Sequence, residues 1–196
     1  VQHNSDDACL HNTATRTDGT LWAWGRNGSG ELGQNSVTPG FSSPVQIGSD
    51  TTWTTNHAHS YRSSFVIKTD GTLWGWGTNQ QGRLGQNENQ DSNNGYSSPV
   101  QIPGTTWSTA DGALAAGQMG VAAIKTDGTL WMWGNSNYGN LGQNVGGPSG
   151  MKSSPVQIPG TTWSKMTMSS YSTFGLKTNG TLWSWGYNIY GQLGLN

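Results

Sequence analysis

The sequence predicts an all-β protein, a β-propeller built from four-stranded blades. Three observations carry this prediction: tryptophan-rich segments recur in a fixed order, 30 of the 196 residues are glycine, and no segment sustains a helical period. A long internal period with several short strands in each unit is typical of propeller blades. A flat solenoid is the alternative, but glycine-rich turns and tryptophans on strand faces favour wedge-shaped blades around an axis.

A tryptophan-bearing hairpin recurs four times and sets the period. Its pattern is T-D/N-G-T-L-W-x-W-G, and it occupies residues 17–25, 69–77, 126–134 and 178–186. Asp-Gly and Asn-Gly pairs tolerate positive φ and favour tight two-residue turns between apolar arms. In the second arm, Trp22 and Trp24 share one strand face while Leu21 and Ala23 share the other. Because both faces are apolar, we expect this strand to be buried between neighbouring sheets.

Three further strands complete each unit. The arm before the turn reads SSFVIK in the second unit and GVAAIK in the third. Two other blocks follow the hairpin, SSPVQI at 42–47, 97–102 and 153–158, and TTW at 51–53, 105–107 and 161–163. PVQI alternates apolar and polar residues after a proline that can begin a strand or lie on an edge. Residues 113–124 could be mistaken for a helix, but their two internal glycines and β-like equivalents predict strands.

We predict one repeat array over residues 1–196, with units at about 1–52, 53–106, 107–162 and an incomplete 163–196. All 11 tryptophans belong to the repeating pattern, so core packing explains them better than stacking on sugars. The repeating glycines are interpreted as turn residues that need unusual backbone angles. The structural residues of the repeat are Trp22, Trp24, Trp74, Trp76, Trp131, Trp133, Trp183, Trp185, Gly30, Gly82, Gly139 and Gly191.

The stretch GSGELG, residues 28–33, matches the G-x-G-x-x-G pattern of dinucleotide-binding loops. Gly28 aligns with Gln80, Asn137 and Ile189 in the other units, so the first glycine is not part of the repeat. No helix is expected after it to hold a phosphate. The sequence therefore predicts a turn here, and no cofactor.

Composition excludes several classes of function. Charged residues make up 10% of the chain and the formal net charge is -1, so the basic patch of a nucleic-acid-binding protein is missing. No apolar run is long enough for membrane insertion. Cys9 is the only cysteine, which excludes an intrachain disulfide and zinc sites built on paired cysteines. Low charge with abundant Asn, Gln, Ser and Thr is compatible with an extracellular or virion-surface location.

Candidates for catalysis or metal binding are few. His57 and His59 could present two imidazoles on one face of a strand, with Asp50 and Tyr61 nearby in sequence. No other unit has an equivalent, and a polar strand or loop explains the segment as well. The recurring turn aspartate becomes Asn179 in the last unit, an exchange that suits a turn residue and not a catalytic acid. We therefore predict no catalytic residue, no metal site and no enzyme.

The recurring tryptophan and glycine segments resemble the regulator of chromosome condensation repeat family, in the form found in bacterial and bacteriophage members. The stretch LWSWGYNIYGQLG, residues 182–194, matches the LWxWGxNxxGQLG half of that repeat throughout. The other half, Gly-x-x-His-x-x-Ala-Leu, is degraded: the first unit keeps His11 and Ala14, and later units have Ser63, Gly120 or Ser172 at the histidine position. The resemblance implies a seven-bladed propeller of four-stranded blades.

About 3.6 repeats are present, too few to close a seven-bladed ring. Three explanations are open: further sequence completes an incomplete ring, other copies of the chain complete it, or four blades close on themselves. The last is the least favoured because one unit lacks half its strands. Exposed terminal blades would present unpaired edges and a tryptophan-rich face, which invites assembly.

Segments that differ between units are the better candidates for partner contact, because the repeat does not require them. They are 36–41, 56–62, 88–96 and 145–152, and the three loop insertions among them should project from the same side of the propeller. Tolerated loop drift explains these segments equally well. The candidate contact residues are His57, His59, Tyr61, Arg62, Asn89, Asp91, Asn93, Tyr96, Pro148 and Met151.

Three functions remain. The first is a non-enzymatic structural or adhesive protein on a bacterial or phage surface, whose partner is a protein, other copies of the chain or a surface glycan. The alternative is a soluble regulator or inhibitor that binds a protein partner through one propeller face. The third, an enzyme or metal-dependent protein, has the least support from the residues. No exchange-factor residue can be matched, so none is transferred from the family.

Overall fold

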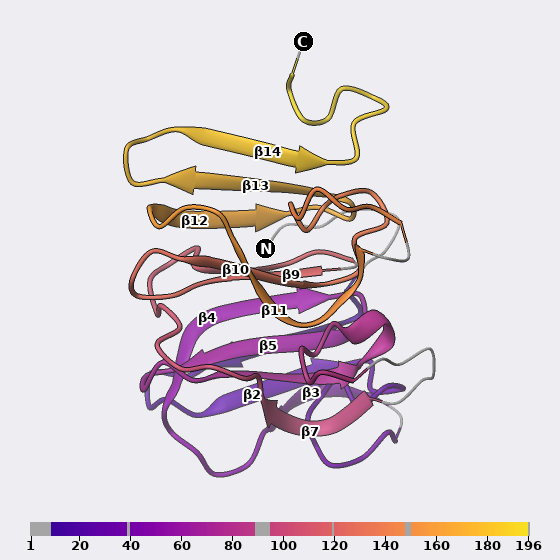
Figure 1. The fold of residues 1–196 in the computed structure, drawn as a ribbon. Helices are drawn as coiled ribbons and strands as arrows, with labels where there is room; N and C mark the ends of the chain where they lie inside the picture. The colour runs from indigo at the N-terminus through magenta and orange to yellow at the C-terminus, as the bar shows by residue number, and fades with distance from the viewer. Residues whose placement is uncertain (1–8, 39, 89–94, 119, 148–149, 196) are drawn as a thin grey trace.

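The computed structural model describes residues 9–38, 40–88, 95–118, 120–147 and 150–195. They form four antiparallel sheets that follow one another along the chain, with β2 and β3 at one end of the array and β14 at the other (Figure 1). The predicted all-β fold is confirmed. The one helix in these residues is a single 3-10 turn, η1 (Gln80–Gly82), so no described helix could cross a membrane.

The strands of each sheet lie side by side in chain order. The first sheet contains β1 (His11–Thr15), β2 (Leu21–Gly25) and β3 (Phe41–Gln46). The second contains β4 (Trp53–Ser60), β5 (Ser63–Lys68), β6 (Leu73–Thr78) and β7 (Gly95–Gln101). The third contains β8 (Leu114–Ala116), β9 (Gly120–Ile124), β10 (Leu130–Gly134) and β11 (Lys152–Ile158). The fourth contains β12 (Trp163–Met168), β13 (Ser172–Lys177) and β14 (Leu182–Gly186).

Only the second and third sheets have all four strands among the described residues. The first lacks a counterpart of β4, and the fourth lacks a counterpart of β7. The segment 113–124, which could be mistaken for a helix, forms β8 and β9 as predicted. The boundaries of the sequence units stay a prediction.

The repeated hairpin is one residue longer at its tip than the sequence predicted. Lys68 N–H donates to the Thr72 carbonyl, and Gly71 N–H donates to the Lys68 carbonyl. This is a three-residue loop closed by a glycine at positive φ, and the same two bonds recur in the other three hairpins. The Asp70 Oδ1 atom accepts bonds from the Thr72 N–H and hydroxyl, and Asn179 does the same for Thr181. The amide of Asn179 therefore accepts the same two hydrogen bonds as the carboxylate of Asp70.

Consecutive sheets are held together by a contact that we call the joint. In the first joint, the indole N–H of Trp76 donates to the Glu31 carbonyl at 2.8 Å. Gly33 lies beneath this indole, where an added Cβ would be 3.2 Å from its nitrogen. Gly30 packs against the backbone of Ser97, whose carbonyl accepts a bond from the Asn35 N–H at 2.7 Å.

The same joint follows the second sheet. There the indole of Trp133 donates to the Arg83 carbonyl at 2.8 Å, and Gly82 packs against Ser153. The third joint keeps only the indole half, from Trp185 to the Asn140 carbonyl at 3.0 Å. Because the fourth sheet lacks a counterpart of β7, a Cβ added at Gly139 would meet nothing within 4 Å. All four glycines of this repeating position have φ between 68° and 81°.

The apolar core lies between the sheets, as the tryptophan pattern predicted for the inner units. Buried side chains form three clusters, one for each pair of neighbouring sheets, and Trp76, Trp107 and Trp133 are among the largest of them. Trp183 differs, since 51% of its surface is exposed on the uncovered side of the fourth sheet. Position in the repeat therefore determines burial only where a neighbouring sheet is present.

Replacing Gly82 with Ala should destabilise the protein more than replacing Gly139. Both glycines have positive φ, which costs alanine about 1–2 kcal/mol. A Cβ at Gly82 would additionally lie 2.6 Å from the Ser153 Cα, adding about 1–3 kcal/mol of overpacking. Urea unfolding measures the free energy of unfolding of the two variants. Equal losses would contradict the close packing of Gly82 against Ser153 in the second joint.

Candidate functional site

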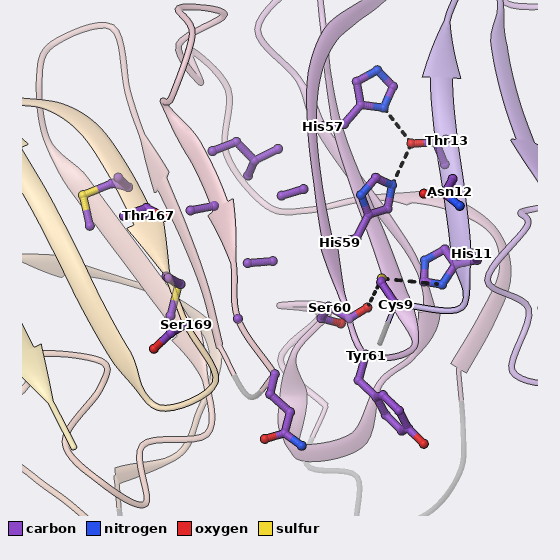
Figure 2. A pocket seen from close by; sticks show the side chains of 18 of the residues that line it. Cys9, His11, Asn12, Thr13, His57, His59, Ser60, Tyr61, Thr167 and Ser169 are labelled. Carbon is purple, nitrogen blue, oxygen red and sulfur yellow. Dashed lines mark hydrogen bonds between the residues drawn. The ribbon is translucent and has the colours of Figure 1, made fainter. Parts of the chain in front are cut away.

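The first described strand of each sheet lines a shared hollow of about 700 Å³. Side chains from β1, β4, β8 and β12 line it, including Leu114, Ala115 and Ala116 of β8 and Met166 and Met168 of β12. Figure 2 shows the histidines on one wall and Thr167 and Ser169 on the other. One wall of the hollow therefore carries the imidazoles, whereas the other combines methionines with hydroxyl side chains.

His57 and His59 of β4 point toward β1 and contact the same hydroxyl (Figure 2). The Thr13 Oγ1 atom lies 2.6 Å from His57 Nδ1 and 2.9 Å from His59 Nε2. His57 Nε2 lies 3.0 Å from the hydroxyl of Thr15, which donates to the Thr54 carbonyl. The two imidazoles stack with ring centroids 6.4 Å apart. The pair predicted to share a face does so, and it ties the first sheet to the second.

His11 and Cys9 extend this cluster along the same wall. His11 is buried, and its Nε2 lies 2.9 Å from the Ser64 hydroxyl of the second sheet. Its ring meets His59 edge-on at 5.4 Å. The Cys9 thiol donates to the Ser60 carbonyl at 3.0 Å. The cluster is thus a set of polar contacts between two sheets.

Burial keeps these groups neutral. It lowers the pKa of His57 to about 4 and that of His59 to about 3, where His11 and His57 add to the effect. Burial also lowers the pKa of His11 to about 4, although the carboxylate of Glu31 opposes the shift. The pKa of Cys9 rises to about 11 for the same reason, so its thiol is a poor nucleophile at neutral pH.

The described residues contain no group of three His, Cys, Asp or Glu side chains placed to hold a metal ion. Asp50, which the sequence places near the histidines, instead pairs with Lys68 at 2.5 Å. That bond lowers the pKa of Asp50 to about 2. Tyr61 also turns away from the imidazoles and lies against Arg62. The sequence neighbours of the histidine pair therefore contribute nothing to it.

A second region of interest is the end of the sheets that carries the loops at 26–38, 79–88, 135–147 and 187–195 and the turns at 61–62 and 169–171. We call it the loop face. At one end of it, the Arg62 guanidinium lies over the Tyr61 ring at 4.7 Å. Buried Arg83 and half-buried Arg26 lie close by, and Arg26 pairs with Glu31 at 3.6 Å.

At the other end of the loop face, three tyrosines from three separate turns meet. The ring centroid of Tyr138 lies 4.8 Å from that of Tyr171 and 4.7 Å from that of Tyr187. Tyr138 is 45% exposed, and the other two are half-buried. Sequence reasoning missed this cluster. The available signal was that Tyr171 and Tyr187 stand at positions where the other units have unrelated residues, whereas Tyr138 has a tyrosine, Tyr190, as its equivalent in the fourth unit.

The remaining predicted contact residues are scattered. Tyr96 lies on β7, where its hydroxyl donates to Glu88 Oε1 at 2.9 Å, and Met151 is half-buried just before β11. His57 and His59 contact Thr13 and Thr15 of the first sheet, apart from the first joint, whereas Tyr61 and Arg62 lie on the loop face. The other four candidates lie outside the described residues: Asn89, Asp91, Asn93 and Pro148.

The sheets, their joints and the position of the hollow define an array of β-propeller blades. Models of the Regulator of chromosome condensation (RCC1) repeat match residues 18–61, 70–124 and 127–176, and a second such model matches 163–192. The chain therefore belongs to the RCC1 repeat family.

The relatives found by sequence are larger proteins, and this chain matches only a part of each. The human E3 ubiquitin-protein ligase HERC2 is 27% identical over 94% of this chain, and the Ultraviolet-B receptor UVR8 of Arabidopsis thaliana is 32% identical over 66% of it. The chain spans only 4% and 28% of their lengths. The mouse protein RCC2 is 30% identical over 68% of the chain, which spans 25% of it.

Solved structures share the fold. Human WBSCR16 superimposes with a TM-score of 0.76 at 23% identity, covering 94% of this chain and 47% of its own. Prp20p from Saccharomyces cerevisiae has a TM-score of 0.76 at 22% identity, covering 95% of this chain and 44% of its own. The described sheets thus correspond to somewhat less than half of each of these chains.

The histidine cluster should make stability depend on pH in a defined window. Because the folded pKa values of about 3 to 4 lie below the ordinary value of 6.5, the unfolded state binds more protons. The stability of the wild type should therefore fall as pH decreases from 6.5 toward 4. His59→Gln, which keeps an amide near the Nε2 position, should reduce this fall.

Calorimetric melting temperatures at several pH values measure this effect. The carboxylates bonded in the turns and to Lys68 have pKa values below their ordinary range, so the stability that they contribute is lost mainly below about pH 4. A His59→Gln profile parallel to that of the wild type would contradict neutral, buried imidazoles.

Proposed function

We propose that the chain is a non-enzymatic protein-binding module that acts as a regulator or inhibitor, and that it binds its partner through the loop face. The observation that carries this proposal is the tyrosine cluster of Tyr138, Tyr171 and Tyr187, together with Tyr61 and Arg62 on the same face. Tyrosine and arginine are enriched in protein interfaces and at their energetic hot spots. Neither the hairpin nor the joint needs any of these side chains.

The charge of the loop face indicates the chemistry of the partner. Arg26, Arg62 and Arg83 lie near one another, and Glu31 is the carboxylate that pairs with one of them. The Nε atom of Arg62 is buried without a hydrogen-bond partner among the described residues. A partner segment with acidic side chains would balance the excess positive charge of the three guanidinium groups.

The relatives support binding over a structural role. Prp20p has been characterised for its binding to Gsp1p and histones, and yeast RCC1 has been crystallised with Kap60. Those partners belong to those proteins, but they favour the regulator among the functions considered for this chain. A structural or adhesive role on a bacterial or phage surface, glycan binding and an extracellular or virion location have no support among the relatives and stay predictions.

Tyr138→Ser combined with Tyr61→Ser should abolish capture of the partner. The change removes one tyrosine ring at each end of the loop face, and each lost hot-spot residue costs about 2 kcal/mol or more of binding. Affinity capture from an extract of the source organism, with quantitative mass spectrometry, identifies proteins retained by the wild type and lost by the variant. Calorimetry with the purified candidate then measures its affinity.

The matched control is Thr105→Ala with Thr161→Ala, two exposed residues at the opposite end of the sheets. It should bind as the wild type does. If every captured protein is retained equally by both double variants, the loop face is not the binding surface.

A further inference from the structure

The two ends of the array carry the halves of a fourth joint. The three internal joints show what each half contains. The preceding sheet supplies a loop with a free carbonyl and two glycines at positive φ, and the following sheet supplies an indole N–H and, where complete, a fourth strand. A described sheet that has no neighbouring sheet on one side therefore presents one half of a joint, either the loop or the indole, with no counterpart to contact.

The fourth sheet presents the loop half, already folded. Gly191 and Gly194 have φ of 75° and 66°, close to the values of their equivalents in the other loops. The Leu193 N–H is bonded to Asn188 Oδ1 at 2.9 Å, as Leu84 is to Asn79 in the second sheet. A Cβ added at either glycine would meet nothing within 4 Å. The Gln192 carbonyl occupies the acceptor position of Glu31, Arg83 and Asn140.

The first sheet presents the indole half. Trp24 stands at the position of Trp76 and Trp133, but it is only half-buried, and no described residue accepts a bond from its indole. Most of β3 is exposed, whereas its counterparts β7 and β11 are mostly half-buried beneath the loop of the preceding sheet. Ser42 of β3 corresponds to Ser97, the residue that Gly30 contacts.

Exposed apolar side chains gather at the same two ends. Of the ten large hydrophobic residues exposed in the described chain, eight belong to the first and fourth units. Surface of this kind is typical of an interface that another element covers. The eight residues are Leu10, Val37, Phe41, Leu182, Trp183, Ile189, Tyr190 and Leu195.

We propose that two copies of this chain associate head to tail, with the Gly191–Gly194 loop of one copy packed on Trp24 and Ser42 of the other. The new contact repeats the internal joints, so its geometry is already present three times in the chain. The two surfaces differ, which makes the interface heterologous, and such an interface forms a ring when the rotation closes. We expect a closed dimer, formed independently of the loop-face partner.

Gly191→Asn tests the loop half. Asparagine tolerates positive φ, and the site is open in the single copy, so the variant should fold. At the equivalent Gly30 and Gly82, an added Cβ lies 2.6 Å from a serine Cα, so the side chain should block the joint. Gly147→Asn, at another open glycine with φ of 71°, is the matched control.

Trp24→Phe tests the indole half by removing its N–H while keeping an aromatic ring. Trp22→Phe is its control, since the Trp22 indole bonds to Thr20 within its own hairpin. Sedimentation velocity across a wide concentration series should show a dimer for the wild type and both controls. Gly191→Asn and Trp24→Phe should each weaken it about tenfold or more. A wild type that stays monomeric, or a dimer that both test variants leave unchanged, would overturn the proposal.

Discussion

The structure depends on one hydrogen bond, from a tryptophan indole of one sheet to a loop carbonyl of the sheet before it. The bond can form only because a glycine lies beneath the indole and a second glycine lets the loop approach the next strand. A buried indole N–H without an acceptor would cost about 1–3 kcal/mol, so the bond fixes how neighbouring sheets sit. Tryptophan and glycine therefore recur together, because the indole can reach the loop carbonyl only where glycine leaves space for the ring.

Much of the fold could be predicted from the sequence because its determinants are local and repeated. The hairpin, SSPVQI and TTW blocks recur in order, and their alternation places strands without any knowledge of contacts. The hairpin tip was predicted one residue too short, because Asp-Gly alone does not reveal that Thr72 closes the loop with Lys68. The exposure of Trp183 in the fourth unit agrees with the tryptophan-rich face expected of a terminal blade, since burial depends on a neighbouring sheet rather than on the local pattern.

The candidate site was less predictable because it depends on contacts between units. His57 and His59 were found as a pair, but their acceptors and donors, Thr13 and Thr15, lie more than 40 residues away and belong to another sheet. That placement makes the imidazoles a second contact between the first and second sheets, beside the joint. The tyrosine cluster was missed for a related reason: Tyr138 and Tyr171 come from different units and meet only when the sheets are packed. Repetition reveals what the units share, whereas the clusters formed by residues in which the units differ appear only once the packing of the sheets is known.

The most direct test compares Trp133→Phe with Trp131→Phe by urea unfolding. Trp133 is fully buried and donates across a joint to the Arg83 carbonyl, whereas Trp131 is half-buried and donates to Thr129 within its own hairpin. Both substitutions keep an aromatic ring, so the difference isolates the bond between sheets. We expect Trp133→Phe to lower the free energy of unfolding by about 1–3 kcal/mol more than Trp131→Phe. Equal losses would contradict the central role of the indole–carbonyl bond.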